Sequence, residues 1–206
     1  MKSPIFEGIA TALITPITPD GIDYEAFGKL IDWQINEGVN ALVICGTTGE
    51  SSTLTDEEHR AAISYAVKCA NHRVPIIAGT GSNDTAYALD LTDFSCKAGV
   101  DGVLVVTPYY NKATQNGLVK MFSDIADKAT APVILYNVPS RTGVNIQPKT
   151  VKALSEHPNI SGIKEASGNI SAVAEIAALC GDNINIYSGN DDQTVPIMSL
   201  GGKGCI

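Results

Sequence analysis

The stretch Ala98-Gly99-Val100-Asp101-Gly102-Val103-Leu104 decides the fold class, because it has the form of a helix end, a glycine that stops the helix, and an entering strand. The stretch Glu37-Gly38-Val39-Asn40-Ala41-Leu42-Val43 repeats this form earlier in the chain. Repeated junctions of this kind predict that units of one strand and one helix follow one another along the sequence. We therefore expect an α/β architecture.

Short apolar runs rich in β-branched residues recur along the chain, with helical periodicity between them. These runs are expected to be strands at 9–14, 41–45, 75–78, 102–106, 132–136, 160–163 and 184–187. Their nearly continuous apolar character indicates that both faces of each strand are covered, as in a parallel sheet flanked by helices. One of the intervening helices is expected to begin at a capping box formed by Thr55 and Glu58.

Polar and glycine residues follow the ends of many of these strands. They occur at 15–16, 46–50, 79–81, 107–110, 137, 164–165 and 188–189. A doubly wound sheet concentrates its site at one switch point, whereas a (β/α)₈ barrel draws functional residues from all its strand ends. We therefore prefer a (β/α)₈ TIM barrel, forming a single domain over residues 1–206.

The last residues, 201–206, have the form of a helix-to-strand turn followed by the start of an eighth strand. A typical barrel has roughly 250 residues, so the sequence predicts a barrel truncated within strand 8, with two unpaired strand edges. A missing final helix would also uncover apolar surface. We therefore expect the 206-residue chain to be poorly stable or inactive.

Composition argues against several classes of protein. The 14 Lys and Arg residues against 22 Asp and Glu give a net charge of −8, which disfavours nucleic acid as a partner. No apolar run approaches the roughly 20 residues that a bilayer requires, and the start lacks a signal peptide's apolar stretch, so we expect no membrane association and a cytoplasmic location. The widely spaced cysteines are expected to be buried as small apolar residues rather than paired: Cys45, Cys69, Cys96, Cys180 and Cys205.

Lys164 is the first candidate for catalysis. It follows the apolar run 160–163, where loss of hydration would lower the pKa of its amine and favour a Schiff base with a carbonyl substrate. The alternative is a strand-end lysine paired with Glu165.

Three other segments could contribute to a site. The loop Gly46-Thr47-Thr48-Gly49-Glu50 could hold a carboxylate or phosphate on its amides and hydroxyls, although a plain glycine-rich turn has the same pattern. Arg141 could clamp a carboxylate or could be a solvated loop residue. The tyrosines at 109–110 and 136 could pass protons, although aromatic residues near strand ends more often serve packing.

The sequence offers no clear metal or cofactor site. His59, His72 and His157 are isolated, with no spacing suited to a metal ion. Neither a Rossmann glycine pattern nor a P-loop is present. The segment 188–192 carries two acids where phosphate-binding barrels have bare amides, which disfavours phosphorylated substrates.

Four motifs occur in order along the chain: Gly46-Thr47-Thr48-Gly49-Glu50, Thr107-Pro108-Tyr109-Tyr110-Asn111, Tyr136-Asn137-Val138-Pro139-Ser140-Arg141-Thr142-Gly143 and Gly162-Ile163-Lys164-Glu165-Ala166-Ser167-Gly168-Asn169. Together they resemble the dihydrodipicolinate synthase family, and the likeness spans essentially the whole chain. The resemblance implies a condensation of pyruvate with L-aspartate 4-semialdehyde, the entry step of diaminopimelate and lysine synthesis, without a cofactor or metal.

The resemblance also implies roles for individual residues. Lys164 would form the imine with pyruvate, and the proton relay would consist of Tyr136, Thr47 and Tyr110, with Tyr110 supplied by a neighbouring subunit of a dimer or tetramer. Thr48 and the backbone around Gly189 and Ile206 would hold pyruvate. Arg141 would receive the carboxylate of the semialdehyde and position Tyr110.

Departures from the family pattern leave alternatives open. Family members continue into a C-terminal helical segment, so the chain is either a fragment of a longer protein or a shortened product. N-acetylneuraminate lyases share the barrel and the lysine, but they usually have Ser-Thr in the glycine loop and lack the arginine. A non-catalytic barrel that senses a keto acid is a third possibility, which the intact relay disfavours.

Feedback inhibition by lysine is expected to be weak or absent. The positions that match the lysine site of sensitive relatives are Ser52, Asp56, His59, Asn83, Tyr87 and Tyr109. Tyr87 stands where sensitive bacterial enzymes have a glutamate, and Asp56 where they often have a histidine. A buried ammonium without a carboxylate partner is costly.

Overall fold

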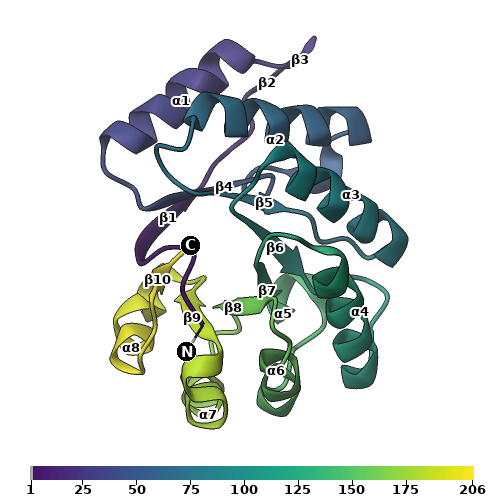
Figure 1. Ribbon diagram of the computed structural model, residues 1–206, viewed down its shortest axis with the longest axis vertical. Coiled ribbons are helices and arrows are strands. Elements are labelled where there is room, and N and C mark those ends of the chain that lie inside the picture. Colours follow the sequence, from purple (N-terminus) through teal and green to yellow (C-terminus); the bar gives the residue numbers. More distant parts are fainter. Residues whose placement is uncertain (1) are drawn as a thin grey trace.

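The computed structural model describes residues 2–206 and has a parallel barrel surrounded by helices (Figure 1). The barrel closes in the strand order β1-β10-β9-β8-β7-β6-β5-β4. Its strands are β1 (Gly8–Ala12), β4 (Ala41–Ile44), β5 (Ile76–Gly79), β6 (Gly102–Val106), β7 (Val133–Asn137), β8 (Ile160–Glu165), β9 (Asn185–Ser188) and β10 (Gly204–Cys205). A separate antiparallel pair is formed by β2 (Ile17–Thr18) and β3 (Gly21–Ile22).

Helices cover the outside of the barrel. They are α1 (Tyr24–Asn36), α2 (Asp56–Ala70), α3 (Thr85–Ala98), α4 (Gln115–Lys128), α5 (Pro139–Thr142), α6 (Pro148–Ser155), α7 (Ile170–Cys180) and α8 (Thr194–Ser199), with short 3₁₀ turns η1 (Ser51–Thr53), η2 (Gly181–Asn183) and η3 (Asp191–Gln193). The (β/α)₈ fold class expected from the sequence is confirmed.

The local signals act as the sequence predicts. Thr55 and Glu58 form the capping box at the start of α2. Gly38 and Gly99, the glycines of the repeated junction, adopt positive φ angles of 86° and 92°. Because a left-handed residue ends a helix and most side chains disfavour that conformation, these glycines turn the chain into the next strand.

The expectation of two unpaired strand edges is wrong. The short strand β10 pairs with both neighbours, through Gly204 with Gly8 of β1 and with Tyr187 of β9. A Cβ atom at Gly204 would collide with the carbonyl oxygen of Gly8. The close approach that glycine permits therefore lets a very short strand close the barrel.

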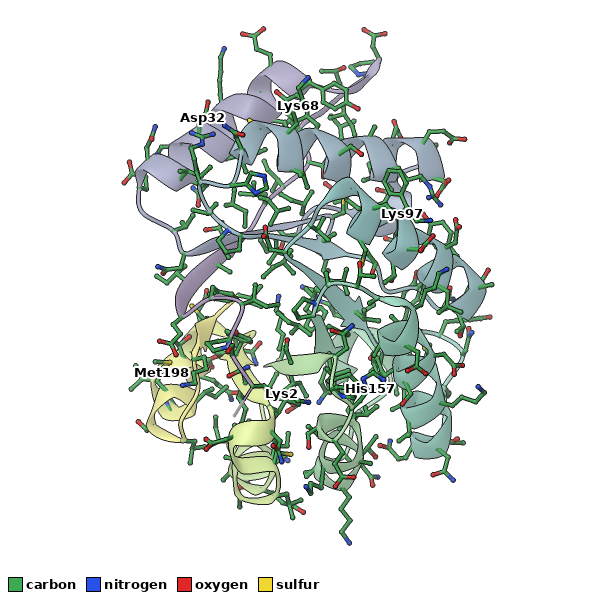
Figure 2. The ribbon with its side chains drawn as sticks, viewed as in Figure 1. Lys2, Asp32, Lys68, Lys97, His157 and Met198 are labelled. Atoms are coloured by element: carbon green, nitrogen blue, oxygen red, sulfur yellow. The ribbon has the colours of Figure 1, made fainter. Side chains whose placement is uncertain are left out.

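Apolar side chains nevertheless remain exposed on β1, α1 and α8. Ile9 of β1 is 56% exposed, Trp33 of α1 57%, and Val195 of α8 75%. Met198 of α8 also faces outward (Figure 2). The poor stability expected of the 206-residue chain stays a prediction.

The cysteines only partly follow the expectation. Cys45 and Cys180 are buried, whereas Cys69, Cys96 and Cys205 are only partly buried. No helix within residues 2–206 has the length and apolar character needed to cross a membrane.

The amino-terminal end of the barrel is plugged by the residues that precede β1. Phe6 stacks on Tyr187 with ring centroids 4.5 Å apart, and the Tyr187 hydroxyl donates a hydrogen bond to the Phe6 carbonyl oxygen at 3.1 Å. Side chains of alternate strand residues, such as Ile77, Leu104 and Ile134, fill the interior above them. An open cavity is left at the opposite end, where the carboxyl ends of the strands meet.

Lys2 ties this plug to the start of β8, and its substitution is expected to destabilise the fold. The Lys2 Nζ atom donates to the carbonyl oxygens of Ser155, His157 and Ile160, each at 2.6 Å (Figure 2). Because the methionine in Lys2→Met leaves these acceptors without a charged donor, the free energy of unfolding should fall by about 2 kcal/mol. Denaturant titration measures the change.

The matched control is Lys203→Met. Lys203 lies at the same end of the barrel and forms only an exposed ion pair with Glu7 at 3.3 Å. Exposed ion pairs contribute less than about 1 kcal/mol to the free energy of unfolding. Equal destabilisation by the two substitutions would show that the hydrogen bonds of Lys2 stabilise the fold no more than the exposed ion pair of Lys203.

Candidate active site

A cavity of about 480 Å³ opens at the carboxyl ends of the barrel strands. It is lined by Ala12, Val43, Gly46, Thr47, Thr48, Leu104, Tyr136, Val138, Ser140, Arg141, Lys164, Ala166, Gly189, Asn190, Asp191 and Ile206. Of the site residues expected from the sequence, only Tyr110 is not among them. The cavity volume suits one or two small metabolites rather than a polymer.

Lys164 lies inside the cavity, 7% exposed, near the carboxyl end of β8. Burial and the nearby charge of Arg141 lower the pKa of its amine to about 8. The Nζ atom lies 4.5 Å from the centroid of the Tyr136 ring. A substantial fraction of this amine is therefore neutral near pH 8, which is the form that attacks a carbonyl carbon.

The alternative pairing of Lys164 with Glu165 does not occur. Successive residues of a strand point to opposite faces, so Glu165 lies on the outside of the barrel. There its carboxylate accepts hydrogen bonds from Asn137 Nδ2 at 2.9 Å and from the Ser167 amide at 2.7 Å.

Gly189 provides the space in which the Lys164 side chain lies. A Cβ atom at this position would lie 3.0 Å from Cε and 3.2 Å from Cγ of Lys164, and 2.8 Å from Cβ of Ala166. The sequence suggested only that the backbone near Gly189 holds a substrate. The structure adds that an alanine here would push the lysine side chain out of place.

Tyr136 lies on β7 beside Lys164, with which it is paired in the strand register. Burial raises the pKa of its hydroxyl, while a hydrogen bond with the Thr47 side chain and the charge of Arg141 act in the opposite direction. The two hydroxyls of Tyr136 and Thr47 thus lie next to each other at the cavity wall. This arrangement suits proton transfer between hydroxyl groups.

The loop 46–49 presents backbone donors to the cavity. It lies between two left-handed residues, Cys45 at φ 54° and Glu50 at φ 55°, a strained conformation of the kind found at functional sites. The backbone amides of Thr47 and Thr48 have no hydrogen-bond acceptor within residues 2–206. A loop with unpaired amides and hydroxyls can bind a carboxylate.

Arg141 lies on α5, the single helical turn that follows β7, and its side chain is exposed at the cavity rim. It forms no salt bridge with an acid of residues 2–206. Its guanidinium is thus available for a carboxylate of a substrate.

Tyr110 does not reach the cavity of its own chain. Its side chain is 88% exposed, and its backbone adopts a φ of 71°. An aromatic side chain in a left-handed conformation and in solvent is unusual. The role of Tyr110 in a neighbouring subunit stays a prediction.

Sequence reasoning missed Ser140, Asn190 and Asp191, which also line the cavity. In the sequence, the two acids of segment 188–192 were interpreted only as evidence against a phosphate site. Their position directly after a strand end was the signal that could have placed them at the barrel mouth.

A second hollow of about 240 Å³ lies beside the first. It is lined by Ser51, Ser52, Leu54, Asp56, His59, Gly81, Ser82, Tyr87 and Tyr109. Most of the positions that match a lysine site are therefore brought together, although Asn83 is not part of the lining. The Asp56 carboxylate already has hydrogen-bond partners within the chain. Arg60 Nε donates to its two oxygens at 2.9 and 2.8 Å, and Tyr87 also hydrogen bonds to it.

Comparison with known proteins places this geometry in a family. A model of the Dihydrodipicolinate synthetase family matches residues 5–206. The chain belongs to this family. The 4-hydroxy-tetrahydrodipicolinate synthase of Acetivibrio thermocellus is 54% identical over 206 residues, which cover 100% of this chain and 70% of that protein.

Solved structures of the dihydrodipicolinate synthetase family have the same fold. The crystal structure of dihydrodipicolinate synthase from Aquifex aeolicus has a TM-score of 0.95 and 47% identity, covering 98% of this chain and 69% of that chain. The enzyme from Acinetobacter baumannii, described as complexed with pyruvate, has a TM-score of 0.95 and 44% identity, covering 98% of this chain and 70% of that chain.

Proposed function

We propose that this chain condenses pyruvate with L-aspartate 4-semialdehyde to give 4-hydroxy-tetrahydrodipicolinate, in the synthesis of diaminopimelate and lysine. The observation that carries the proposal is the buried Lys164 amine, whose pKa is lowered to about 8, at the mouth of a barrel of this family. The family members that it resembles carry the name of this activity. No cofactor or metal is needed for the steps below.

The first step is imine formation. The neutral Lys164 amine attacks the keto carbon of pyruvate, and loss of water gives a protonated imine. The pyruvate carboxylate would be bound by the unpaired amides of Thr47 and Thr48 and by the backbone near Gly189 and Ile206. These groups surround the lysine in the cavity.

The second step uses the imine as an electron sink. Its positive charge makes the former pyruvate methyl group acidic, so loss of a proton gives an enamine that attacks the aldehyde carbon of the second substrate. After the C–C bond forms, the amino group of the semialdehyde would attack the imine carbon, and Lys164 would leave as the free amine, which closes the ring of the product. Tyr136 and Thr47, with Tyr110 of a neighbouring subunit, would carry protons to and from the cavity. Arg141 would bind the carboxylate of the semialdehyde.

A lyase that cleaves a longer 2-keto acid, such as N-acetylneuraminate, is not favoured by the site. Thr47 and Arg141 both face the cavity, and the sialic acid lyases usually lack the arginine. A coupled assay with aspartate semialdehyde against a sialic acid separates the two activities. A sensor without catalysis would show neither.

The experiment that tests the proposal is reductive trapping. The protein is incubated with pyruvate and borohydride, and peptide mass spectrometry should find a reduced pyruvyl adduct on Lys164. Lactate, which has no keto group, is the matched control ligand. An unmodified Lys164 in a protein with full activity would contradict the mechanism.

The proposal includes self-association to a dimer or tetramer and a cytoplasmic location. Tyr110 supports the first, because its side chain is exposed and does not line the cavity of its own chain, which therefore lacks one expected proton-transfer group. The second follows from the metabolites proposed as substrates.

Lysine is expected to inhibit the enzyme weakly or not at all. The side hollow contains Asp56 as a possible partner for an ammonium group, but Arg60 and Tyr87 already hydrogen bond to that carboxylate. An inhibition curve with lysine should therefore stay flat through the submillimolar range. The variant Tyr87→Glu, which adds a carboxylate, is expected to become sensitive, and half-inhibition of the wild type by submillimolar lysine would refute the prediction.

A further inference from the structure

A buried carboxylate lies on the outer face of the barrel without a role in the steps above. Glu165 is 1% exposed and lies next to Lys164 on β8. No cation pairs with it among the described residues. Burying a charged group without a counter-ion is costly, so a carboxylate held only by hydrogen-bond donors requires an explanation.

The principal side-chain donor to Glu165 is Asn137, which is also 1% exposed and lies opposite it on β7. Asn137 Nδ2 lies 2.9 and 3.2 Å from the two oxygens of Glu165. An ionised carboxylate only accepts hydrogen bonds. Glu165 therefore fixes the orientation of the Asn137 amide, because a flipped amide would place oxygen against oxygen.

The fixed amide then holds the chain that follows β7. Asn137 Oδ1 accepts a hydrogen bond from the Ile146 amide at 3.0 Å, and Asn137 Nδ2 donates to Asn145 Oδ1 at 2.8 Å. The chain thus leaves the barrel at Asn137 and returns to the side chain of the same residue. The segment 138–146 is closed at its base.

Arg141 lies within this closed segment. Inside it, Thr142 Oγ1 donates to the carbonyl oxygens of Val138 and Val144, which gives the turn its shape. Those bonds fix the turn internally but do not attach it to the barrel. The attachment comes from Asn137, and from Gln115 of α4, whose Nε2 donates to the Asn145 carbonyl oxygen at 2.8 Å.

We propose that Asn137, oriented by the buried Glu165 carboxylate, is a positioning residue that holds segment 138–146 so that Arg141 meets the carboxylate of the aldehyde substrate. The inference rests on the proposed function for the identity of that substrate. It assigns to Glu165 and Asn137 a share in selectivity, although neither lines the cavity. A displacement of about 1 Å in a positioning group can cost up to roughly 100-fold in rate.

Two substitutions release the segment in different ways. Glu165→Gln supplies a group that both donates and accepts, so the Asn137 amide is no longer held in one orientation. Asn145→Ala removes one acceptor at an exposed position, where loss of folding is not expected. Asn145→Asp keeps the acceptor oxygen and is the conservative variant.

The matched control lies on α3. Thr92→Val removes the buried hydrogen bond from Thr92 Oγ1 to Thr80 Oγ1 at 2.9 Å, and that bond involves no residue of segment 138–146. It should lower the melting temperature without affecting Arg141. A purely structural role of Glu165 would give the same pattern as this control.

Two readouts are taken on each protein: the rate of limited trypsin cleavage after Arg141 under native conditions, and the KM values for pyruvate and for aspartate semialdehyde. In Glu165→Gln and Asn145→Ala, cleavage should accelerate and the KM for the semialdehyde should rise about 10-fold, while the KM for pyruvate stays within about twofold. Asn145→Asp and Thr92→Val should resemble the wild type in both readouts.

The outcomes separate this inference from the proposed function. If pyruvate and borohydride fail to label the wild-type protein, the proposed function is contradicted. The cleavage rates would still show whether Glu165 and Asn137 hold segment 138–146. Cleavage at the wild-type rate in both releasing variants overturns the inference. So does faster cleavage without a change in the semialdehyde KM of an enzyme that does form the pyruvate adduct.

Discussion

Lys164→Ala is expected to lower kcat by on the order of 10⁴-fold or more, because it removes the group that we propose to carry the covalent intermediate. The fold should persist. Lys164 donates no hydrogen bond to another described residue, and its removal relieves the burial of a charge. Steady-state kinetics measure the loss, and the melting temperature provides the control. Residual activity above about one per cent of the wild type would require another nucleophile.

The pH dependence of the same step follows from the lowered pKa of Lys164. Only the neutral amine attacks, and its fraction rises as the pH passes upward through about 8, the pKa in the folded protein. We expect kcat/KM for pyruvate to increase with pH below this value and to level off above it. Arg141→Gln removes one of the charges that lower this pKa, so the rise should move to higher pH.

The remote substitution Arg60→Gln is the control for that shift. Arg60 pairs with Asp56 and Asp90 on the helical layer and does not line the main cavity. Its loss should leave the pH profile unchanged. An unchanged profile in Arg141→Gln as well would mean that burial alone lowers the pKa of Lys164.

The barrel was predictable because its signals are local and repeated. Gly38 and Gly99 end helices through a backbone conformation that depends on the residue itself, and the apolar runs match the barrel strands within a few residues. The closing strand was not predictable in the same way. Its pairing depends on how closely Gly204 approaches Gly8, a distance that is set by the whole circumference of the barrel and not by a short stretch.

The sequence was enough to name candidate residues of the site, but not the residues that hold them in place. Lys164 was recognisable from the apolar run 160–163 that it follows, and Arg141 from the motif 136–143 that resembles the family. Glu165 was interpreted only as a possible partner of Lys164. The alternation of side chains along β8 places it on the other face, and its bond to Asn137 joins residues that are distant in the sequence. A single sequence contains no direct signal for such a contact.

Tyr110→Phe is expected to lower kcat by roughly 10² to 10⁴-fold, the usual contribution of a proton-transfer group, because the phenylalanine lacks the hydroxyl that we propose to complete the relay. The side chain is 88% exposed, so its loss should not affect folding of the single chain. Tyr109→Phe is the neighbouring control, since Tyr109 does not line the cavity that holds Lys164.

Mixing two inactive variants decides whether Tyr110 acts in its own subunit or in the neighbouring one. In a mixed dimer of Lys164→Ala and Tyr110→Phe, one site combines an intact Lys164 with an intact Tyr110 from the partner, provided that the tyrosine crosses a symmetric interface. Random mixing makes half of the dimers mixed, with one complete site each, so activity should return to about one quarter of the wild type.

If Tyr110 served its own subunit, each site would lack one group and no activity would return. Subunit exchange should be shown by mass spectrometry of the mixture, because recovery requires that mixed dimers form. Exchange without recovery would place Tyr110 in its own subunit, where it does not line the Lys164 cavity and the relay would have to end at Thr47.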